Sequence, residues 1–560
     1  MTTNTIHIFG GGIAGLTVAH EILERQSNFR VNLYESNSEL GGFARSSTTP
    51  NGLPIEHSWR GYADFYFNTF DVLKRIPTNS GKTVFDNLSK PLSFLLPHDV
   101  LTERGPKPTP NFLDLLIAGY PVLKCLMSGD SRKNTVFATM PFVSKRFLRS
   151  VSPEAYDQYV HMLGPGLGLS PNRVSVYDIA KYTEMSIAAW FQPETTKKYF
   201  QTVDKWRVMT APTSKAWFDP WKSWLQKNGL TLHFNHELRQ YILDPTQHTI
   251  TSCLVRNNST GENLQIGSAR DVYVFCINPY NLADIILRSF PSGYTFKSLP
   301  MHQRLLKITT EQPPHKQIAF TWLLDKSVKS PTRTIVLAFP DSEFTITLCP
   351  QDRIFFQDAK FGIWSGTICQ AQDDRLSFDI ESPAGKLFNL PAEFLTVDKI
   401  QQELIYQIFR SAELAELVRA NNTFELRDLV VLEYEIWKEW TYDPYSHTLI
   451  SSARKWVTSI NTLPKWRPEQ KTQVSNLFFG GAHTATSTHI WSMESAVESG
   501  KIIAKYICTP DKPKISFHSH LLPLNVLQSI DDILFQARLP HLLDLVLLFT
   551  AIAIFLQLVK

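Results

Sequence analysis

The sequence has few features of a zinc-binding or disulfide-linked protein. It contains six cysteines in 560 residues, which lie far apart and form no CxxC pair. Zinc sites and disulfide redox centres depend on closely spaced cysteines, and small secreted scaffolds depend on many of them. The cysteine pattern argues against all three classes. We predict no metal site, and we expect buried or reactive thiols in a reducing compartment.

Excess charge, low-complexity sequence and a secretion signal are also lacking. The 56 Lys and Arg exceed the 52 Asp and Glu by four, too dilute an excess to bind nucleic acid by electrostatics. Prolines and glycines are spread through the chain, so no long disordered segment is predicted. The first residues lack the basic and apolar regions of a signal peptide, and we expect none.

One long apolar run stands near the C-terminus. Residues 542–559 are mostly aliphatic or aromatic, interrupted by Asp544 and Gln557. As a helix, these 18 residues would measure about 27 Å, slightly less than the hydrocarbon core of a bilayer. We predict a membrane anchor within residues 539–560, which would hold the protein at the cytoplasmic face of a membrane. The alternative is a helix docked on the protein's own apolar surface.

Two other apolar features are interpreted as core. Residues 112–123 are too short and too interrupted to span a bilayer, and a buried helix is favoured over a membrane-facing substrate entrance. Trp217, Trp221 and Trp224 share one face of a predicted helix. Such a stripe is usually core, although an aromatic tunnel for a conjugated substrate is the alternative.

The N-terminal segment predicts a dinucleotide-binding turn. Residues 5–9 form a β-branched and aromatic run, followed by three glycines at G-x-G-x-x-G spacing and then a helical pattern. The first glycine permits a tight turn, the second lets the backbone approach a pyrophosphate, and the third lets helix and strand pack closely. The predicted cofactor-binding residues of this turn are Gly10, Gly12, Ile13, Ala14 and Gly15.

An acidic residue and a further glycine pair indicate which dinucleotide binds. A second predicted strand ends in Glu35, twenty residues after Gly15. A carboxylate there accepts hydrogen bonds from the two ribose hydroxyls and repels a 2′-phosphate. Gly41 and Gly42 follow, and they let the backbone approach the flavin end of a longer cofactor, with Arg45 as a phosphate or substrate partner. This arrangement favours FAD over NAD.

The motifs resemble, in this order, those of the flavoprotein superfamily that holds monoamine oxidases, protoporphyrinogen oxidase and the phytoene and zeta-carotene desaturases. Residues 476–484 and 491–500 resemble the strand and helix that close the FAD site in that superfamily. The resemblance implies that Gly481 approaches the ribityl chain and that the helix N-terminus around Met493 faces the flavin. Phe43 replaces the usual base after the first glycine pair, and Ala482 replaces the usual acid after the second.

The resemblance also implies an α/β fold with interleaved domains. A Rossmann-like FAD-binding domain would alternate with a substrate domain of mixed sheet and helices, followed by an apolar C-terminal helix. In the FAD-binding domain, the backbone near Leu238 would meet the adenine. The expected divisions are 1–95, 225–300 and 430–508 for FAD binding, 96–224 and 301–429 for the substrate, 509–538 as a linker, and 539–560 as the anchor.

The electron path is limited by what the sequence lacks. It has no second G-x-G-x-x-G turn after a strand and no CxxC pair, so a nicotinamide domain of the disulfide-reductase type is absent. Electrons are therefore expected to come from an organic substrate, as hydride from a C–H bond, and to leave to oxygen or a quinone. FAD is expected to be non-covalent, because the nearest cysteine before the terminal motif is the distant Cys369.

Local residues separate the candidate reactions. Monoamine oxidases have a tyrosine before the Met-Glu pair, whereas this chain has Ser492 and resembles the desaturases there. We predict an FAD-dependent oxidoreductase that acts on a small lipophilic substrate. The alternatives are an amine oxidase that releases hydrogen peroxide and a non-enzymatic flavoprotein. Candidate catalytic residues are His57, which is also a candidate flavin contact, Trp491 as an aromatic wall, and Lys316 as a lysine near the flavin.

Overall fold

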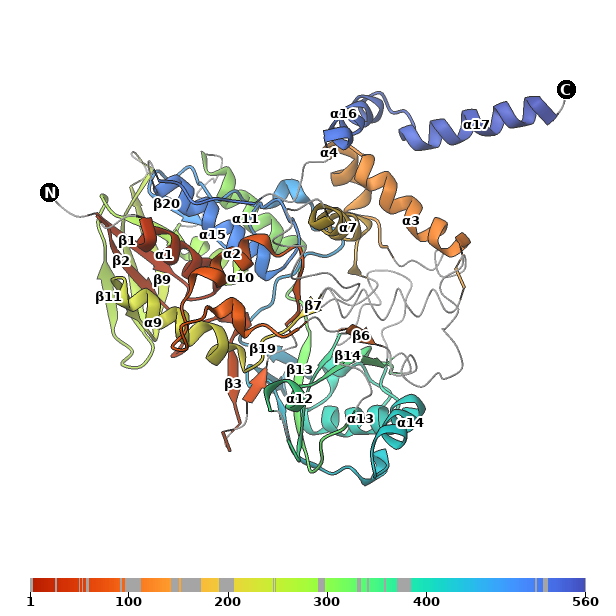
Figure 1. Ribbon diagram of the computed structural model, residues 1–560. Helices are drawn as coiled ribbons and strands as arrows, with labels where there is room; N and C mark the ends of the chain where they lie inside the picture. The colour runs from red at the N-terminus through yellow and green to blue at the C-terminus, as the bar shows by residue number, and fades with distance from the viewer. Residues whose placement is uncertain are drawn as a thin grey trace.

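The computed structural model contains two large sheets with helices around them (Figure 1). It describes residues 4–25, 28–49, 51–52, 54–56, 60–90, 93–95, 112–142, 151–152, 173–190, 206–244, 246, 248–290, 298–329, 334–339, 342–356, 359–369, 384–508, 511–516 and 522–558.

Five parallel strands from widely separated parts of the chain form the first sheet. Their order is β20-β12-β1-β2-β8, and every neighbouring pair is parallel. The carboxyl ends of the strands therefore meet at one edge, where open α/β sheets bind ligands. The strands are β1 (Thr5–Phe9), β2 (Arg30–Tyr34), β8 (Leu230–His233), β12 (Val272–Phe275) and β20 (Leu477–Phe479).

Both faces of this sheet are covered, because side chains alternate along each strand. Ile6 and Ile8 of β1 enter one apolar cluster, whereas Phe9 enters another on the opposite face. The first cluster includes residues of α1 (Ile13–Arg25), α2 (Phe67–Arg75) and α15 (Met493–Ile507). The second includes residues of β9 (His236–Asp244), β10 (Thr249–Asn257), α10 (Pro279–Ser289) and α11 (Pro300–Glu311), with β11 (Asn263–Ile266) at its edge.

The second sheet has six strands in the order β17-β13-β16-β15-β14-β6. All its pairings are antiparallel except the parallel pairing of β14 with β6. Helices α13 (Val397–Phe409) and α14 (Ala412–Asn421) share an apolar cluster with it. The strands are β6 (Ser93–Leu95), β13 (Ile318–Leu324), β14 (Thr334–Phe339), β15 (Ile346–Pro350), β16 (Gly362–Ile368) and β17 (Val431–Ile436).

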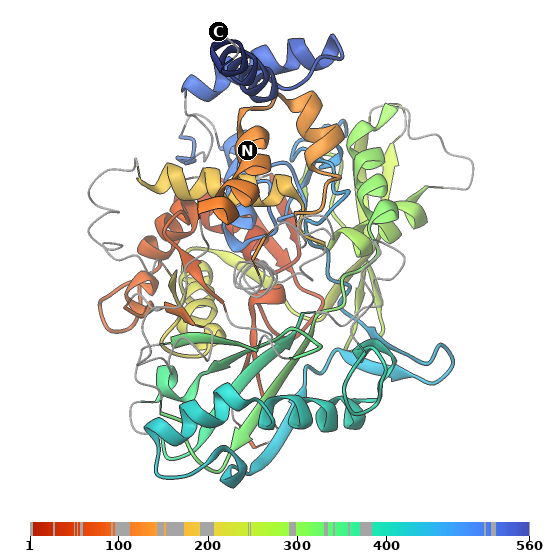
Figure 2. The same cartoon turned by 90° about the vertical axis from the view of Figure 1, so that its right-hand side faces the viewer.

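A helical group lies at one end of the molecule in both views (Figures 1 and 2). It comprises α3 (Phe112–Met127), α4 (Asp130–Arg132), α7 (Val176–Trp190), α16 (Leu522–Gln536) and α17 (Leu542–Leu558). Arg132 of α4 forms an ion pair with the buried Asp531 of α16, with Nε 3.0 Å from Oδ2. Residues 509–538, predicted as a linker, therefore contain a helix fixed to the rest of the protein.

The segment predicted as a membrane anchor forms α17, which has no buried side chain. Asp544 near its start accepts hydrogen bonds from Tyr120 and Lys124 of α3, and the remainder of α17 projects from the molecule (Figure 1). A helix docked along the protein's own surface is therefore not found. Within the described residues, no helix is both long and apolar enough to cross a membrane, so the predicted membrane-spanning helix is not supported.

The prediction of a buried helix at residues 112–123 is wrong for one of its faces. Ala118 and Val122 are buried in α3, but Phe112 and Leu113 are 76% and 62% exposed. The sequence pattern indicated an apolar helix but could not show that one of its faces stays exposed.

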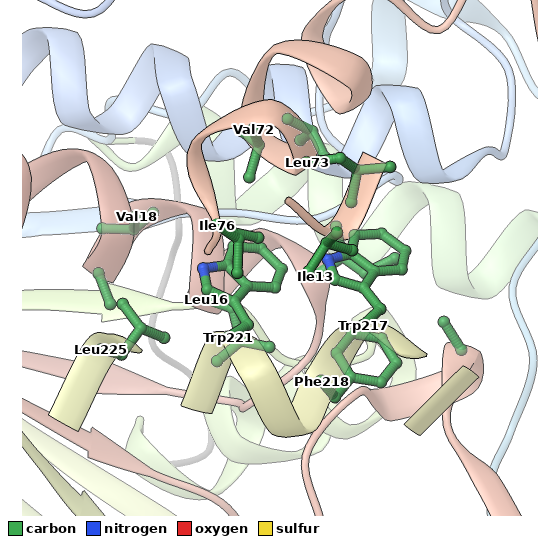
Figure 3. Close-up of a cluster of buried hydrophobic side chains, with 14 of the residues drawn as sticks. Ile13, Leu16, Val18, Val72, Leu73, Ile76, Trp217, Phe218, Trp221 and Leu225 are labelled. Atoms are coloured by element: carbon green, nitrogen blue, oxygen red, sulfur yellow. The ribbon is translucent and has the colours of Figure 1, made fainter. Parts of the chain in front are cut away.

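The tryptophan stripe belongs to the core, as its spacing indicated (Figure 3). Trp217 and Trp221 are fully buried in the cluster beneath α1 and α2, with ring centroids 5.7 Å apart. Trp224 is partly buried and stacks on His20 at 4.2 Å. They stand on a π-helical turn, η6 (Ser214–Phe218), and on α9 (Asp219–Lys227). The interpretation of the stripe as core is confirmed.

Shorter elements complete the described part of the chain. They are β3 (Ser46–Thr48), β4 (Pro54–Glu56), β5 (Tyr62–Ala63), β7 (Trp206–Arg207), β18 (Trp440–Asp443), β19 (Thr448–Ser451), α12 (Asp352–Phe355) and the turns η1 (Gly42–Ala44), η2 (Val84–Asn87), η4 (Lys133–Phe137), η8 (Ala392–Phe394), η9 (Leu426–Asp428) and η10 (Pro464–Trp466).

Candidate active site

A cavity of about 750 Å³ lies at the carboxyl edge of the five-stranded sheet and reaches the start of β13 in the six-stranded sheet. Its walls come from segments that are far apart in the sequence. Lining residues include Gly10 after β1, Glu35 after β2, Cys276 after β12, Gly481 after β20, and Gln317 just before β13. The site is therefore assembled only when both sheets are in place.

The first glycine turn is fixed by close backbone contacts. Gly10 has φ +105°, and a Cβ there would lie 2.2 Å from the carbonyl oxygen of Cys276. A Cβ on Gly15 would lie 2.1 Å from the carbonyl oxygen of Gly10. Both distances are far below van der Waals contact, so only glycine fits these two positions. Gly15 packs the turn and is not among the cavity-lining residues.

The middle glycine differs from its neighbours because it faces the cavity. A Cβ on Gly12 would meet only the Cα of Gly42, at 3.9 Å. Gly42 also lines the cavity, and Gly41 N donates to Gly11 O at 2.8 Å, which joins the two glycine turns. Ile13 and Ala14 line the same place at the first turn of α1, where backbone N–H groups favour anions. This cradle fits a diphosphate.

The carboxylate of Glu35 is held firmly at the cavity wall. Its Oε2 accepts a hydrogen bond from Gly11 N at 2.7 Å, and its Oε1 accepts from Asn37 N at 2.9 Å. The side chain is only 6% exposed. It therefore stands in a fixed position beside the glycine turn, where a ribose hydroxyl can donate to it.

Arg45 lines the cavity, but its guanidinium is already bound to other groups of the protein. Its guanidinium forms an ion pair with Glu439, and its Nη1 donates to Gly42 O at 2.9 Å. This pairing ties the second glycine turn to the segment between β17 and β18. Leu238, whose backbone is predicted to meet the adenine, also lines the cavity.

 The terminal motif that is predicted to close the FAD site consists of β20, α15 and the segment between them. The strand β20 leads to Gly481, which has φ +135°, and α15 begins at Met493. Both residues line the cavity. Ser492 caps α15 by accepting a hydrogen bond from Ser495 N at 3.1 Å. The N-terminus of this 15-residue helix therefore directs its positive dipole end toward the cavity.

A buried arginine that the sequence did not reveal supports this motif. Arg467 is 1% exposed, and its guanidinium donates to the carbonyl oxygens of Ala482 and His483. Burial, followed by the nearby Arg467, lowers the pKa of His483 to about 3, so this cavity-lining imidazole is neutral. Ala482 stands in place of the usual acid of this motif, and the loop at Ala482 is held by the hydrogen bonds from Arg467 to its backbone.

Aromatic side chains line much of the cavity. Trp491 lies edge-on to Phe43, with ring centroids 6.0 Å apart, and Trp456 approaches Trp491 at the same distance. Phe65, Tyr66, Tyr182 and Trp206 line a further part of the wall. Of the catalytic candidates, Trp491 is thus placed at the cavity as an aromatic wall.

Of the other two catalytic candidates, Lys316 is described and does not line the cavity. Lys316 forms an ion pair with Glu393, with Nζ 2.5 Å from Oε2, and its neighbour Gln317 lines the cavity in its place. Successive side chains of an extended segment point to opposite sides, which explains the exchange. His57 lies outside the described residues.

Lys455 and Glu439 are cavity-lining residues that sequence reasoning missed. Both lie in the stretch between β17 and the terminal motif, where no spacing pattern marks them. Burial lowers the pKa of Lys455 to about 8. Only the folded arrangement shows that these charged side chains face the cofactor motifs.

Two family models match separate segments of the chain. "NAD(P)-binding Rossmann-like domain" matches residues 8–76, and "Flavin containing amine oxidoreductase" matches residues 438–508. A zeta-carotene desaturase from Arabidopsis thaliana is 21% identical over 534 residues, which cover 90% of this chain and 85% of that protein. The chain is therefore similar to flavin-containing amine oxidoreductases and to a carotene desaturase.

Solved structures share the fold of this chain at low identity. An oxidoreductase from Methanosarcina mazei has a TM-score of 0.55 and 11% identity, covering 89% of this chain and 99% of its own. Cyclohexylamine oxidase from Brevibacterium oxydans has a TM-score of 0.52 and 12% identity, covering 90% and 98%. These likenesses concern the fold.

The protein is an FAD-dependent oxidoreductase. Its residues fit the cofactor, because Gly12 and Gly42 leave a space that a Cβ would fill and Glu35 stands where a ribose would lie. Bound FAD would supply the electron-accepting chemistry at the junction of the two sheets.

Proposed function

We propose that the protein removes hydride from a C–H bond of a small lipophilic substrate, in the manner of a desaturase or dehydrogenase, and passes the electrons to oxygen or a quinone. The observation that carries this proposal is the apolar wall of the cavity. Phe43, Phe65, Tyr182 and Trp491 line the space that continues from the glycine turns, and an apolar substrate gains by leaving water for such a wall.

The residue before Met493 supports the same reaction. Ser492 is used as the helix cap of α15, and its hydroxyl accepts from Ser495 N. It supplies no aromatic face, so the cage typical of monoamine oxidases lacks one wall at this position. The aromatic rings would instead orient an apolar donor and exclude water from the reacting carbon.

An anaerobic reduction assay tests the proposal. The oxidised protein is mixed with isoprenoids, other lipids or amines, and the loss of the oxidised-flavin absorption bands shows which class donates electrons. We expect an apolar C–H donor to bleach the flavin. Bleaching by simple amines, with none by lipids, would contradict the proposal.

An amine oxidase that releases hydrogen peroxide is the second candidate. It is supported by the match to the flavin-containing amine oxidoreductases at residues 438–508 and by the fold shared with cyclohexylamine oxidase. In that case Trp491, at 6.0 Å from Phe43, would provide the aromatic wall in place of the tyrosine. Peroxide release with primary or secondary amines would favour this candidate.

We also propose that the helical end of the protein rests on the cytoplasmic surface of a membrane. The supporting observation is a set of exposed apolar side chains on α3, α16 and α17, helices that lie at one end of the molecule (Figure 2). The side chains include Phe112 and Leu113 of α3, Ile533 of α16, and Phe549 and Phe555 of α17. Apolar side chains in this arrangement favour insertion into the interfacial region of a bilayer.

Vesicle flotation tests the membrane proposal. Deleting residues 539–560 should move the protein from phosphatidylcholine vesicles to the soluble fraction while FAD stays bound, because the cavity contains no residue beyond Ala496. A matched control is Ile242→Ser, which removes an exposed apolar side chain of β9. Equal flotation of full-length and shortened protein would contradict the proposal.

We also propose the division of the chain into two interleaved domains that the sequence predicts. Residues 1–95, 225–300 and 430–508 would form the FAD-binding domain, and 96–224 and 301–429 the substrate domain. The five-stranded sheet supports the first set, since all its strands fall within those ranges. The six-stranded sheet would move β6 and β17, which lie at the edges of the ranges, to the substrate domain.

A further inference from the structure

The charged groups of the cavity wall are unevenly compensated. Most of them have a partner of opposite charge or several N–H donors. The pairs are Arg45 with Glu439, Arg60 with Glu56, Arg454 with Asp284, and Glu237 with Arg239, while Glu35 accepts from Gly11 and Asn37.

Lys455 is the exception in the interior of the cavity. Its Nζ donates to the neutral amide oxygen of Gln317, and among the described residues no carboxylate lies within ion-pair distance of it. Arg288 also lines the cavity without a carboxylate partner, but it is exposed at the outer surface. Lys455 is therefore an uncompensated ammonium group within the protein.

The surroundings of Lys455 place it at the junction of the two sheets. Its backbone carbonyl accepts from His315 N at 2.7 Å, which ties it to the segment that leads into β13. The groups that face its side chain are Gln317, the thiol of Cys369 and the guanidinium of Arg60. Burial raises the pKa of Cys369 to about 12, so the thiol is neutral and supplies no negative charge.

We propose that Lys455 binds a carboxylate of the substrate, so that the substrate is an amphipathic carboxylic acid whose apolar body lies along the aromatic wall. This inference rests on the proposed oxidation of a lipophilic donor and names the polar group of that donor. The ammonium group has N–H donors beyond the one used on Gln317, and charge-assisted hydrogen bonds to a carboxylate are among the strong ones. A substrate ammonium at the same place would be repelled.

The pH dependence follows from the charge on Lys455. The thiol of Cys369 stays neutral, and neither an amide nor an arginine guanidinium changes charge in this pH range. Lys455 is therefore the facing group that changes charge near neutral pH. Burial lowers its pKa to about 8. Carboxylate binding should therefore be strongest below pH 8 and weaken above it.

A titration with matched ligands tests the proposal. Decanoate, 1-decanol and decylamine share one chain length, and their binding to the full-length FAD-loaded protein is measured from the perturbation of the flavin spectrum. We expect decanoate to bind about tenfold or more tightly than 1-decanol, because of the charge-assisted bond. Decylamine should bind more weakly than either.

Variants locate the effect. Lys455→Met should remove the preference for decanoate over 1-decanol while leaving 1-decanol binding within about twofold, and Lys455→Gln serves if the first variant folds poorly. Lys465→Met, which removes an exposed lysine ten residues away, should keep the preference.

Several results would overturn the assignment. They are equal binding of the three ligands, the absence of any spectral change with decanoate, and a preference that survives in Lys455→Met. Loss of FAD from Lys455→Met with an unchanged ligand preference would show that the lysine serves the cofactor instead. A wild-type protein that binds decanoate by Lys455 but is reduced by no lipid would contradict the proposed function alone.

Discussion

The two sides of the cavity differ in whether backbone atoms or side chains form the wall. On the side of the five-stranded sheet, backbone atoms of glycine turns and helix N-termini form the wall, as at Gly12 and Gly42. On the side of the six-stranded sheet, side chains such as Gln317 and Lys455 form it. A backbone wall suits a cofactor that does not change, whereas a side-chain wall can be altered to suit a substrate without changing the cofactor site.

Replacing the cavity-facing glycine should have the largest effect on the cofactor. In Gly12→Ala the new methyl group meets no protein atom closer than 3.9 Å, so the fold should be kept, but the methyl group occupies the space of the diphosphate. We expect FAD affinity to fall by at least about 100-fold, the cost of a steric clash of roughly 3 kcal/mol. Fluorescence titration with FAD measures the change.

The matched control is Gly119→Ala in α3, where a Cβ meets nothing within 4 Å and which is not among the cavity-lining residues. It should bind FAD like the unaltered protein. If Gly12→Ala also keeps its FAD affinity, the backbone wall does not hold the diphosphate.

The buried Glu498 tests how the helix α15, which borders the cofactor side of the cavity, contributes to the free energy of unfolding. Its carboxylate is buried in α15 and accepts from Ser487 N at 2.6 Å, and burial raises its pKa to about 7. Between the unfolded pKa and pH 7 the folded state keeps a proton that the unfolded state has lost, so the free energy of unfolding falls as pH rises. Glu498→Gln should raise stability by up to about 3 kcal/mol at pH 8.

Chemical denaturation at two pH values checks this prediction. Near pH 4 both states carry the proton, so Glu498→Gln and the unaltered protein should differ little. A variant that is less stable at pH 8 would show that the ionised carboxylate is stabilised by its surroundings.

Removal of the ribose acceptor should have a smaller effect than a methyl group in the cradle. Glu35→Ala loses charge-assisted hydrogen bonds worth roughly 1.5–3 kcal/mol, so FAD affinity should fall by about 10- to 150-fold in the same titration. Glu262→Ala, an exposed position on the hairpin of β10 and β11, is the control. Equal affinities would place the ribose elsewhere.

The smallest effect on the cofactor is expected from the six-stranded sheet. Trp322 Nε1 donates to Gln401 Oε1 at 2.9 Å in its core. Trp322→Phe should lower the free energy of unfolding by about 1–3 kcal/mol, because a buried amide oxygen loses its donor, while FAD affinity stays unchanged. Denaturation and FAD titration on one sample separate the two; a parallel loss of FAD would show that the two sides are not independent.

The backbone side of the site could be predicted largely from the sequence. Gly10 and Gly15 are required by contacts with the carbonyl oxygens of Cys276 and Gly10, so glycine spacing records the geometry directly. The alternation of β1 and the burial of Trp217 and Trp221 also follow from local periodicity.

The side-chain wall could not be predicted, because it depends on pairings between distant segments. Lys316 and Gln317 are equivalent in sequence, and only the register of β13 decides which of them faces the cavity. Lys455 is held at the cavity because its backbone forms a β-bridge with that of His315, 140 residues earlier in the chain.

The helical end shows a second limit of sequence reasoning. Residues 509–538 were predicted to be a linker, but they contain the packed helix α16. This helix is fixed by the ion pair of Asp531 with Arg132, 399 residues earlier in the chain, and the local sequence does not show such a distant partner. Apolar composition indicated helices at α3 and α17, but composition does not show which faces stay exposed.

The most direct test of the account is the cofactor content of the purified full-length protein. The protein should be yellow, and precipitation by heat or acid should release one FAD per chain into the supernatant, identified by chromatography against FMN and riboflavin. A stable, folded protein that is colourless and shows no affinity for added FAD would contradict the assignment of the cavity as a flavin site.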